Sequence, residues 1–182
     1  YDGWSGLAGG LIHIAWIDST IDDVLYVTLD TASADALSTQ TTIFLGASTG
    51  TGGHMSITRT RGGNVLCKVD IDGGTEGGFF RLQNANVPNG AWDAARTIND
   101  ALAVNDKMIM LPGFAADNQD AIGIFWDDSA NEISRYLYDD SADTWAETSI
   151  ATSMTGLSEA VGFSNFSAAV DLTNSRIVLV AW

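Results

Sequence analysis

The sequence is poor in the residue types from which several kinds of site are built. Its one cysteine, Cys67, rules out a disulfide within the chain and lies on an apolar stretch typical of a buried strand. The two histidines, His13 and His54, lie far apart and cluster with no cysteine, which argues against a transition-metal centre. Lysine and arginine total 8 against 23 aspartates and glutamates, a formal charge of −15. This charge opposes binding to nucleic acid and to anionic membrane surfaces.

Long apolar runs and helical patterns are also missing. No run reaches the length of a transmembrane helix and no signal peptide is visible, so we expect no membrane insertion. The glycine-rich stretches GGTEGG and GASTGTGG lack the lysine of a phosphate-binding loop. Two prolines, 19 glycines and many short β-rich runs instead favour a turn-rich β protein.

What the sequence does contain is a repeated β unit. Its clearest copy, residues 121–150, indicates three strands joined by the turns DDSAN and DDSAD. The turn sequence SADTW has a similar copy, SADAL, near the N-terminus. Trp126 lies 110 residues after Trp16 and 56 before Trp182, which gives a period of roughly 55 residues. Tryptophans that recur at one position of a repeat indicate packing between neighbouring units rather than stacking on a ligand.

Each period has room for a further strand before this unit, and four antiparallel strands make one blade of a β-propeller. We therefore expect an all-β chain in one domain, a β-propeller segment of about 3.5 four-stranded blades. The expected divisions are a partial blade at 1–45, blades at 53–98 and 107–150, and the start of a further blade at 166–182. A β-sandwich with accidental internal similarity is the alternative.

The blade count raises the question of how the open edges are covered. A closed propeller needs at least four blades, and the chain begins at Tyr1 and ends at Trp182 inside an expected strand pair. The sequence therefore suggests an excerpt, whose edges are covered either by missing blades of a longer chain or by self-association. Two copies would make a ring of about seven blades.

One turn carries a family resemblance. Residues 138–145, YDDSADTW, resemble the Asp-box of sialidase-like propellers, whose pattern is roughly S-x-D-x-G-x-T-W. Asp140, Thr144 and Trp145 match, whereas Tyr138 replaces the serine and Ala142 the glycine. The resemblance implies a structural turn motif, in which the aspartate caps backbone amides of the turn and the aromatic ring packs into the sheet. More degenerate copies lie at 30–37 and 87–92.

The resemblance does not carry an activity with it. Sialidases hold the substrate carboxylate with three arginines and use a Tyr–Glu pair as nucleophile and an aspartate as acid/base. Of the six arginines here, Arg59 is expected on an inner strand, where it would face a central pocket. No pattern brings three arginines together, so we assign no catalytic residue. We expect a non-catalytic binding or structural module of a secreted, cell-surface or virion protein; a fragment of a sialidase-like glycoside hydrolase is the alternative.

Acidic residues gather in the turns between the second and third strand of each expected blade. Because strands alternate in direction, these turns share one face, which is the ligand-binding face in sialidase-like propellers. A negative rim there would repel sialic acid and would suit a neutral glycan, a protein or a cationic ligand. The expected ligand-binding residues of this acidic arc are Asp18, Asp22, Asp23, Asp70, Asp72, Asp127 and Asp128.

Two further interpretations of the acidic turns stay open. Carboxylates and turn carbonyls are ligands that Ca²⁺ prefers, but DSTIDD and DDSANE match no full calcium loop. Short acidic turns are commonly stabilised by the aspartate side chains alone. Two carboxylates flanking a sugar could also cleave it. We expect no cofactor and no metal site, with a calcium-stabilised scaffold as the remaining possibility.

Overall fold

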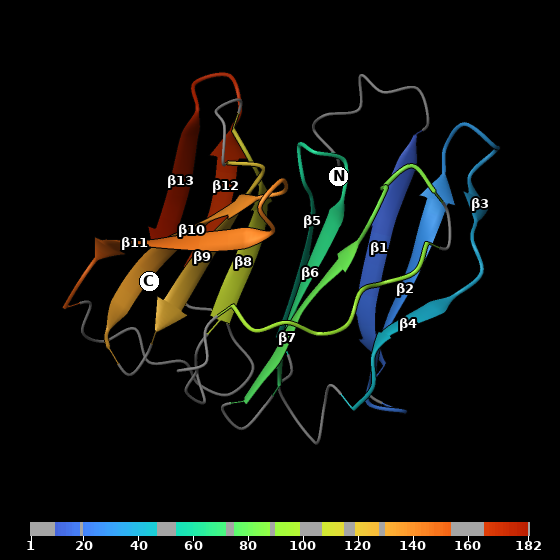
Figure 1. The fold of residues 1–182 in the computed structure, drawn as a ribbon, viewed down its shortest axis with the longest axis horizontal. Helices are drawn as coiled ribbons and strands as arrows, with labels where there is room; N and C mark the ends of the chain where they lie inside the picture. The colour runs from blue at the N-terminus through green and yellow to red at the C-terminus, as the bar shows by residue number, and fades with distance from the viewer. Residues whose placement is uncertain are drawn as a thin grey trace.

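The computed structural model describes residues 10–18, 20–46, 54–71, 75–87, 90–98, 107–114, 119–127, 130–153 and 166–181. In these ranges the chain forms β-strands and turns, and no helix. The all-β prediction is confirmed. The strands form four antiparallel sheets, here named A to D in chain order (Figure 1).

Sheet A is the N-terminal one, and both of its short strands, β3 and β4, pair with β2. Its strands are β1 (Leu11–Asp18), β2 (Asp23–Asp30), β3 (Ala36–Leu37) and β4 (Thr41–Phe44). Sheet B has the order β5-β6-β7. Its strands are β5 (His54–Arg59), β6 (Val65–Ile71) and β7 (Thr75–Leu82). Isolated bridges from Phe79 to Arg96 and from Leu82 to Trp92 extend sheet B beyond β7.

Sheets C and D make up the C-terminal half. Sheet C is a four-stranded meander, and it contains the three strands expected at 121–150. Its strands are β8 (Lys107–Pro112), β9 (Ala121–Asp127), β10 (Glu132–Asp139) and β11 (Thr144–Ala151). Sheet D is the hairpin of β12 (Phe166–Asp171) and β13 (Arg176–Ala181).

The four sheets stack face to face in chain order, with an apolar layer between each pair (Figure 1). Tyr26 of sheet A meets Phe80 of sheet B in the first layer. Neighbouring sheets also touch through their first strands, β1 with β5, β5 with β8, and β8 with β12. Sheet C therefore has a covered face on each side, and residues Ala121–Trp126 of β9 are all buried. A strand buried on both faces needs the continuous apolar sequence AIGIFW.

Three tryptophans pack between sheets, and one of them, Trp126, belongs to the recurring set; Trp16 is not among the residues of the apolar layers, and Trp182 lies outside the described residues. Trp92 lies in the layer between sheets A and B, Trp145 between B and C, and Trp126 between C and D. The Trp92 ring meets Tyr26 edge-on at 5.0 Å between ring centroids. Burying such large rings supplies much of the apolar area that holds the stack together.

Four hairpins share one loop length and the same features at the described ends of the loop. Each has four residues between an aspartate that ends one strand and the residue opposite it on the next. The aspartate carboxylate accepts a backbone N–H from two or three residues further on, and the last loop residue has a positive φ. The aspartates are Asp18, Asp127, Asp139 and Asp171, and the last loop residues are Asp22 (58°), Asn131 (52°), Asp143 (55°) and Ser175 (52°). Short side chains with local hydrogen bonds suit both positions.

Candidate functional site

Three of the aspartates predicted for the acidic arc lie at the ends of strands. Asp18 and Asp23 lie opposite each other where β1 and β2 join, and Asp127 ends β9. Two of their carboxylates stabilise turns: Oδ1 of Asp18 accepts the backbone N–H of Thr20 at 2.9 Å, and Oδ1 of Asp127 that of Ala130 at 2.7 Å. Oδ1 of Asp23 accepts the backbone N–H of Gly46, after β4, at 3.2 Å. Asp22 closes the first of these turns with its positive φ. Asp72 and Asp128 lie outside the described residues.

Asp70 is placed in the core rather than on an acidic rim. Its side chain is 4% exposed and forms an ion pair with the ammonium of Lys68, which is 1% exposed. His54 Nδ1 lies 3.8 Å from the second carboxylate oxygen. Burial by itself raises the pKa of Asp70, but attraction to Lys68, the hydrogen bond from Lys68 and the nearby His54 outweigh it and hold the pKa below its ordinary value. This aspartate is therefore part of the packing between sheets.

Arg59 is also engaged within the chain. It ends β5, and one of its terminal nitrogens donates to the Asn86 side-chain oxygen at 3.3 Å. Cys67, the one thiol, is fully buried beside sheet A. Burial raises the pKa of this thiol to about 12, so it does not act as a nucleophile near neutral pH.

The turn that resembles an Asp-box is capped by a different aspartate from the one that the resemblance implies. The Asp139 carboxylate accepts the backbone N–H groups of Ser141 at 2.8 Å and of Ala142 at 3.1 Å. Hydrogen bonds from the Ser141 hydroxyl and from Ala142 hold the pKa of Asp139 below its ordinary value. Thr144 lies opposite Asp139 on β11, and Trp145 packs on Tyr138 at 4.8 Å between ring centroids.

Asp140 instead joins sheet C to sheet B. Its carboxylate accepts hydrogen bonds from the Thr60 hydroxyl and, at 2.9 Å, from the Asn64 amide. Both donors lie in or beside the turn between β5 and β6. A Cβ at Gly62 would overlap the Asp140 carboxylate, so the glycine is needed for this close approach.

A second polar network also links sheets B and C. Arg81 Nε lies 3.1 Å from Asp93 Oδ2, and an Arg81 terminal nitrogen lies 3.3 Å from Asp143 Oδ2. Arg96 forms an ion pair with Asp143, whose other oxygen accepts the Tyr138 hydroxyl at 2.6 Å. Two guanidinium groups are thus balanced by two carboxylates. A substrate carboxylate would have to displace Asp93 or Asp143 to bind there.

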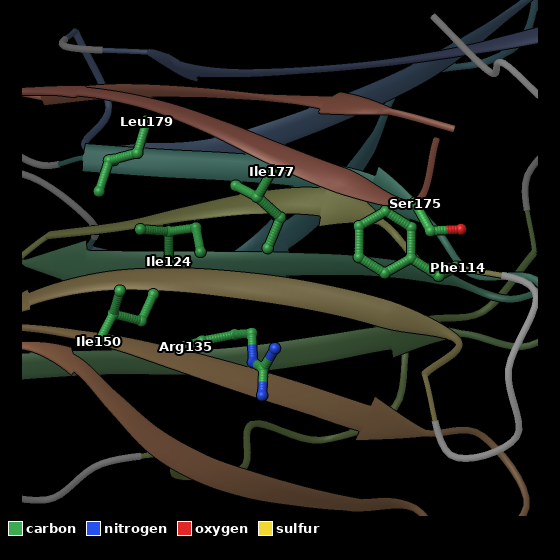
Figure 2. Close-up of a pocket in the computed structure, with 7 residues that line it drawn as sticks. All are labelled: Phe114, Ile124, Arg135, Ile150, Ser175, Ile177 and Leu179. Carbon is green, nitrogen blue, oxygen red and sulfur yellow. The ribbon is translucent and has the colours of Figure 1, made fainter. Parts of the chain in front are cut away.

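A pocket of about 270 Å³ lies between sheets C and D. Its walls come from β9, β10, β11 and β13, with one residue after β8 and one from the β12–β13 turn (Figure 2). The lining residues are Phe114, Ile124, Arg135, Ile150, Ser175, Ile177 and Leu179. The pocket is therefore an apolar chamber with one cation and one hydroxyl.

Arg135 is the residue that sequence reasoning missed. It lies on β10 between Ile133 and Leu137, which share its face of the sheet and pack in the apolar layer toward sheet D. Its Nε is buried, and the described residues offer it no hydrogen-bond acceptor. The alternation in EISRYLY was the available signal, because it places an arginine on the apolar face of a strand.

No protein-family model matches this chain, and no curated protein is significantly similar to it. In the described ranges, no group of three or more histidine, cysteine, aspartate or glutamate side chains is arranged to hold a metal ion. Nor does this part of the chain contain a helix of the length and apolarity that a membrane span requires. The functional interpretation therefore rests on the stacked sheets, the polar networks and the pocket.

Proposed function

We propose that this chain is a segment of a sialidase-like β-propeller and serves as a non-catalytic binding or structural module. The observation that carries the binding function is the pocket between sheets C and D, an apolar chamber in which Arg135 has a buried donor without an acceptor in the described residues. Apolar pockets with a few convergent polar groups are the usual form of ligand sites.

The architecture of the proposal draws support from the stack of sheets. Antiparallel meanders that follow one another face to face, with first strands adjacent, resemble successive propeller blades. Further blades or a second copy of the chain would complete the ring. The acidic turns at Asp18 and Asp127 would then lie on a rim suited to a neutral glycan or a protein partner of a secreted, cell-surface or virion protein.

The lining of the pocket supports binding over catalysis. A glycoside hydrolase needs two carboxyl groups on either side of the scissile bond, and no aspartate or glutamate is among the lining residues. The Asp93 and Asp143 carboxylates lie in one network of ion pairs, where Arg81 and Arg96 already neutralise their charge.

A fragment of a sialidase-like glycoside hydrolase is the second candidate. One observation favours it, because Arg81, Arg96 and Tyr138 meet in a single network. A third arginine and a glutamate would have to come from elsewhere in a longer protein.

The test is ligand-observed NMR with a panel of small neutral sugars, apolar amides and apolar carboxylates, alongside fluorogenic glycosides. We expect binding without turnover. Ile177→Trp, which fills the pocket, should abolish binding, whereas Val178→Trp on the opposite, exposed side of β13 should leave it unchanged. Hydrolysis that Tyr138→Phe abolishes would establish the second candidate. Binding that Ile177→Trp leaves unchanged would overturn the pocket as the binding site.

A further inference from the structure

The immediate surroundings of Arg135 make it unusual among the charged residues described. On β10 its same-face neighbours are Ile133 and Leu137, and across the sheet it stands opposite Ile124 of β9 and Thr148 of β11. The facing sheet contributes the apolar side chains of β13. A guanidinium thus projects from a largely apolar layer into an open chamber (Figure 2).

The Nε donor of this guanidinium has no hydrogen-bond acceptor among the described residues. Arg135 Nε is buried and unpartnered within the described ranges, as Arg96 Nε also is, but Arg81 and Arg96 face carboxylates and Arg135 has no ion pair in the described residues. A buried donor without an acceptor is costly, and a charged one more so. A ligand that supplies an anionic acceptor at this point would therefore form a stronger interaction than the same anion would on an exposed arginine.

The size and lining of the pocket define the rest of the ligand. At about 270 Å³ it lies just below the roughly 300–1,000 Å³ typical of sites for drug-sized molecules, so the ligand is small. Phe114, Ile124, Ile177 and Leu179 would contact an apolar body, and the Ser175 hydroxyl is the second polar group. The planar fork of a guanidinium matches the two oxygens of a carboxylate.

We propose that the pocket between sheets C and D binds a small carboxylate with an apolar body, a short aliphatic or aryl-substituted carboxylic acid. The carboxylate accepts hydrogen bonds from Arg135, and the apolar body lies against Ile177 and Leu179. This assignment rests on the proposed binding function of the same pocket, and it names the chemical class of the ligand.

The test uses octanoate as the probe and octanamide as its neutral counterpart. The chain is labelled with ¹⁵N, and the arginine Nε–H signals are followed by NMR during titration, with Arg135 assigned from its loss in Arg135→Gln. We expect octanoate to shift the Arg135 Nε–H signal and to bind about tenfold or more tightly than octanamide, because only the carboxylate forms the charge-assisted pair. In Arg135→Gln the affinity for octanoate should fall to that for octanamide.

Arg176→Gln is the matched control, because Arg176 is an exposed arginine on β13, in the facing sheet that forms the other side of the pocket. It should leave both affinities unchanged. Equal binding of octanoate and octanamide, abolished by Ile177→Trp, would overturn the carboxylate assignment and leave the binding function intact. Failure of both probes and of the whole panel would overturn both. If Arg135→Gln does not fold, the difference in affinity of the wild type for the two probes still decides the question.

Discussion

The two interfaces of sheet C differ in how their charged side chains are paired. Toward sheet B, Lys68 pairs with Asp70, and Arg81 and Arg96 pair with Asp93 and Asp143. The Asp140 carboxylate there accepts hydrogen bonds from Thr60 and Asn64. Toward sheet D, Arg135 has no partner of opposite sign in the described residues, and a pocket opens beside it. A paired buried charge is part of the structure that joins two sheets, whereas an unpaired one beside a cavity indicates a ligand.

The largest effect is expected from removing one member of the buried pair. Lys68→Met should lower the free energy of unfolding by about 3–5 kcal/mol, because it leaves the Asp70 carboxylate buried without its cation. Urea unfolding measures the change. Lys68→Met combined with Asp70→Leu should recover most of the loss, since it leaves neither charge behind. If Lys68→Met alone were as stable as the wild type, the Lys68–Asp70 pair would not stabilise the interface between sheets B and C.

The same pair predicts a pH dependence. The pKa of Asp70 is lower in the folded state than the ordinary value of about 3.9. The unfolded chain therefore takes up the proton first as the pH falls. The stability that this group contributes is fully present above about pH 4 and is lost as the pH falls through the folded-state pKa. Between pH 7 and pH 3, the free energy of unfolding should fall more steeply for the wild type than for the Lys68→Met/Asp70→Leu variant.

The half-exposed network between sheets B and C should show a smaller effect. Asp143→Asn should cost about 1–2 kcal/mol, because Arg81 and Arg96 lose a shared anion at a partly screened site. Asparagine keeps the size and tolerates the positive φ of this position. Asp35→Asn is the control, since Asp35 also has a positive φ but is exposed. Equal costs for the two variants would show that the turn, and not the ion pairs, is responsible.

The turn after β10 contains two aspartates with different roles, Asp139 within the turn and Asp140 in contact with sheet B. Asp139→Ala should destabilise the turn itself through the loss of the hydrogen bonds from Ser141 and Ala142. Asp140→Ala should instead loosen the contact of sheet C with Thr60 and Asn64, and hydrogen exchange of the β5–β6 turn should rise. If Asp139→Ala accelerated exchange in the β5–β6 turn and Asp140→Ala did not, the two roles assigned above would be reversed.

The strands and turns were predictable because their causes are local. Short runs of alternating apolar and polar residues, ended by aspartates, specify hairpins wherever they occur. The strands at 121–150 could therefore be predicted from the sequence. The roles of individual charges were not predictable, because they depend on which sheet lies opposite. Asp70 and Asp127 both read as acidic residues at a strand end, yet one is buried beside Lys68 and the other caps a turn. The resemblance likewise predicted Asp140 as the cap of the turn, whereas Asp139 caps it.

Replacing a cation by methionine at each interface of sheet C compares the two interfaces directly. Arg135→Met replaces an unpartnered cation by an apolar side chain in a largely apolar layer, so it should leave stability unchanged or raise it by about 1 kcal/mol. Lys68→Met makes the same chemical change and should be strongly destabilising. Urea unfolding of the two variants side by side decides the point. A loss of several kcal/mol in Arg135→Met would mean that Arg135 has a structural role, whereas opposite signs would show that it is retained at a cost to stability, as a residue that serves binding often is.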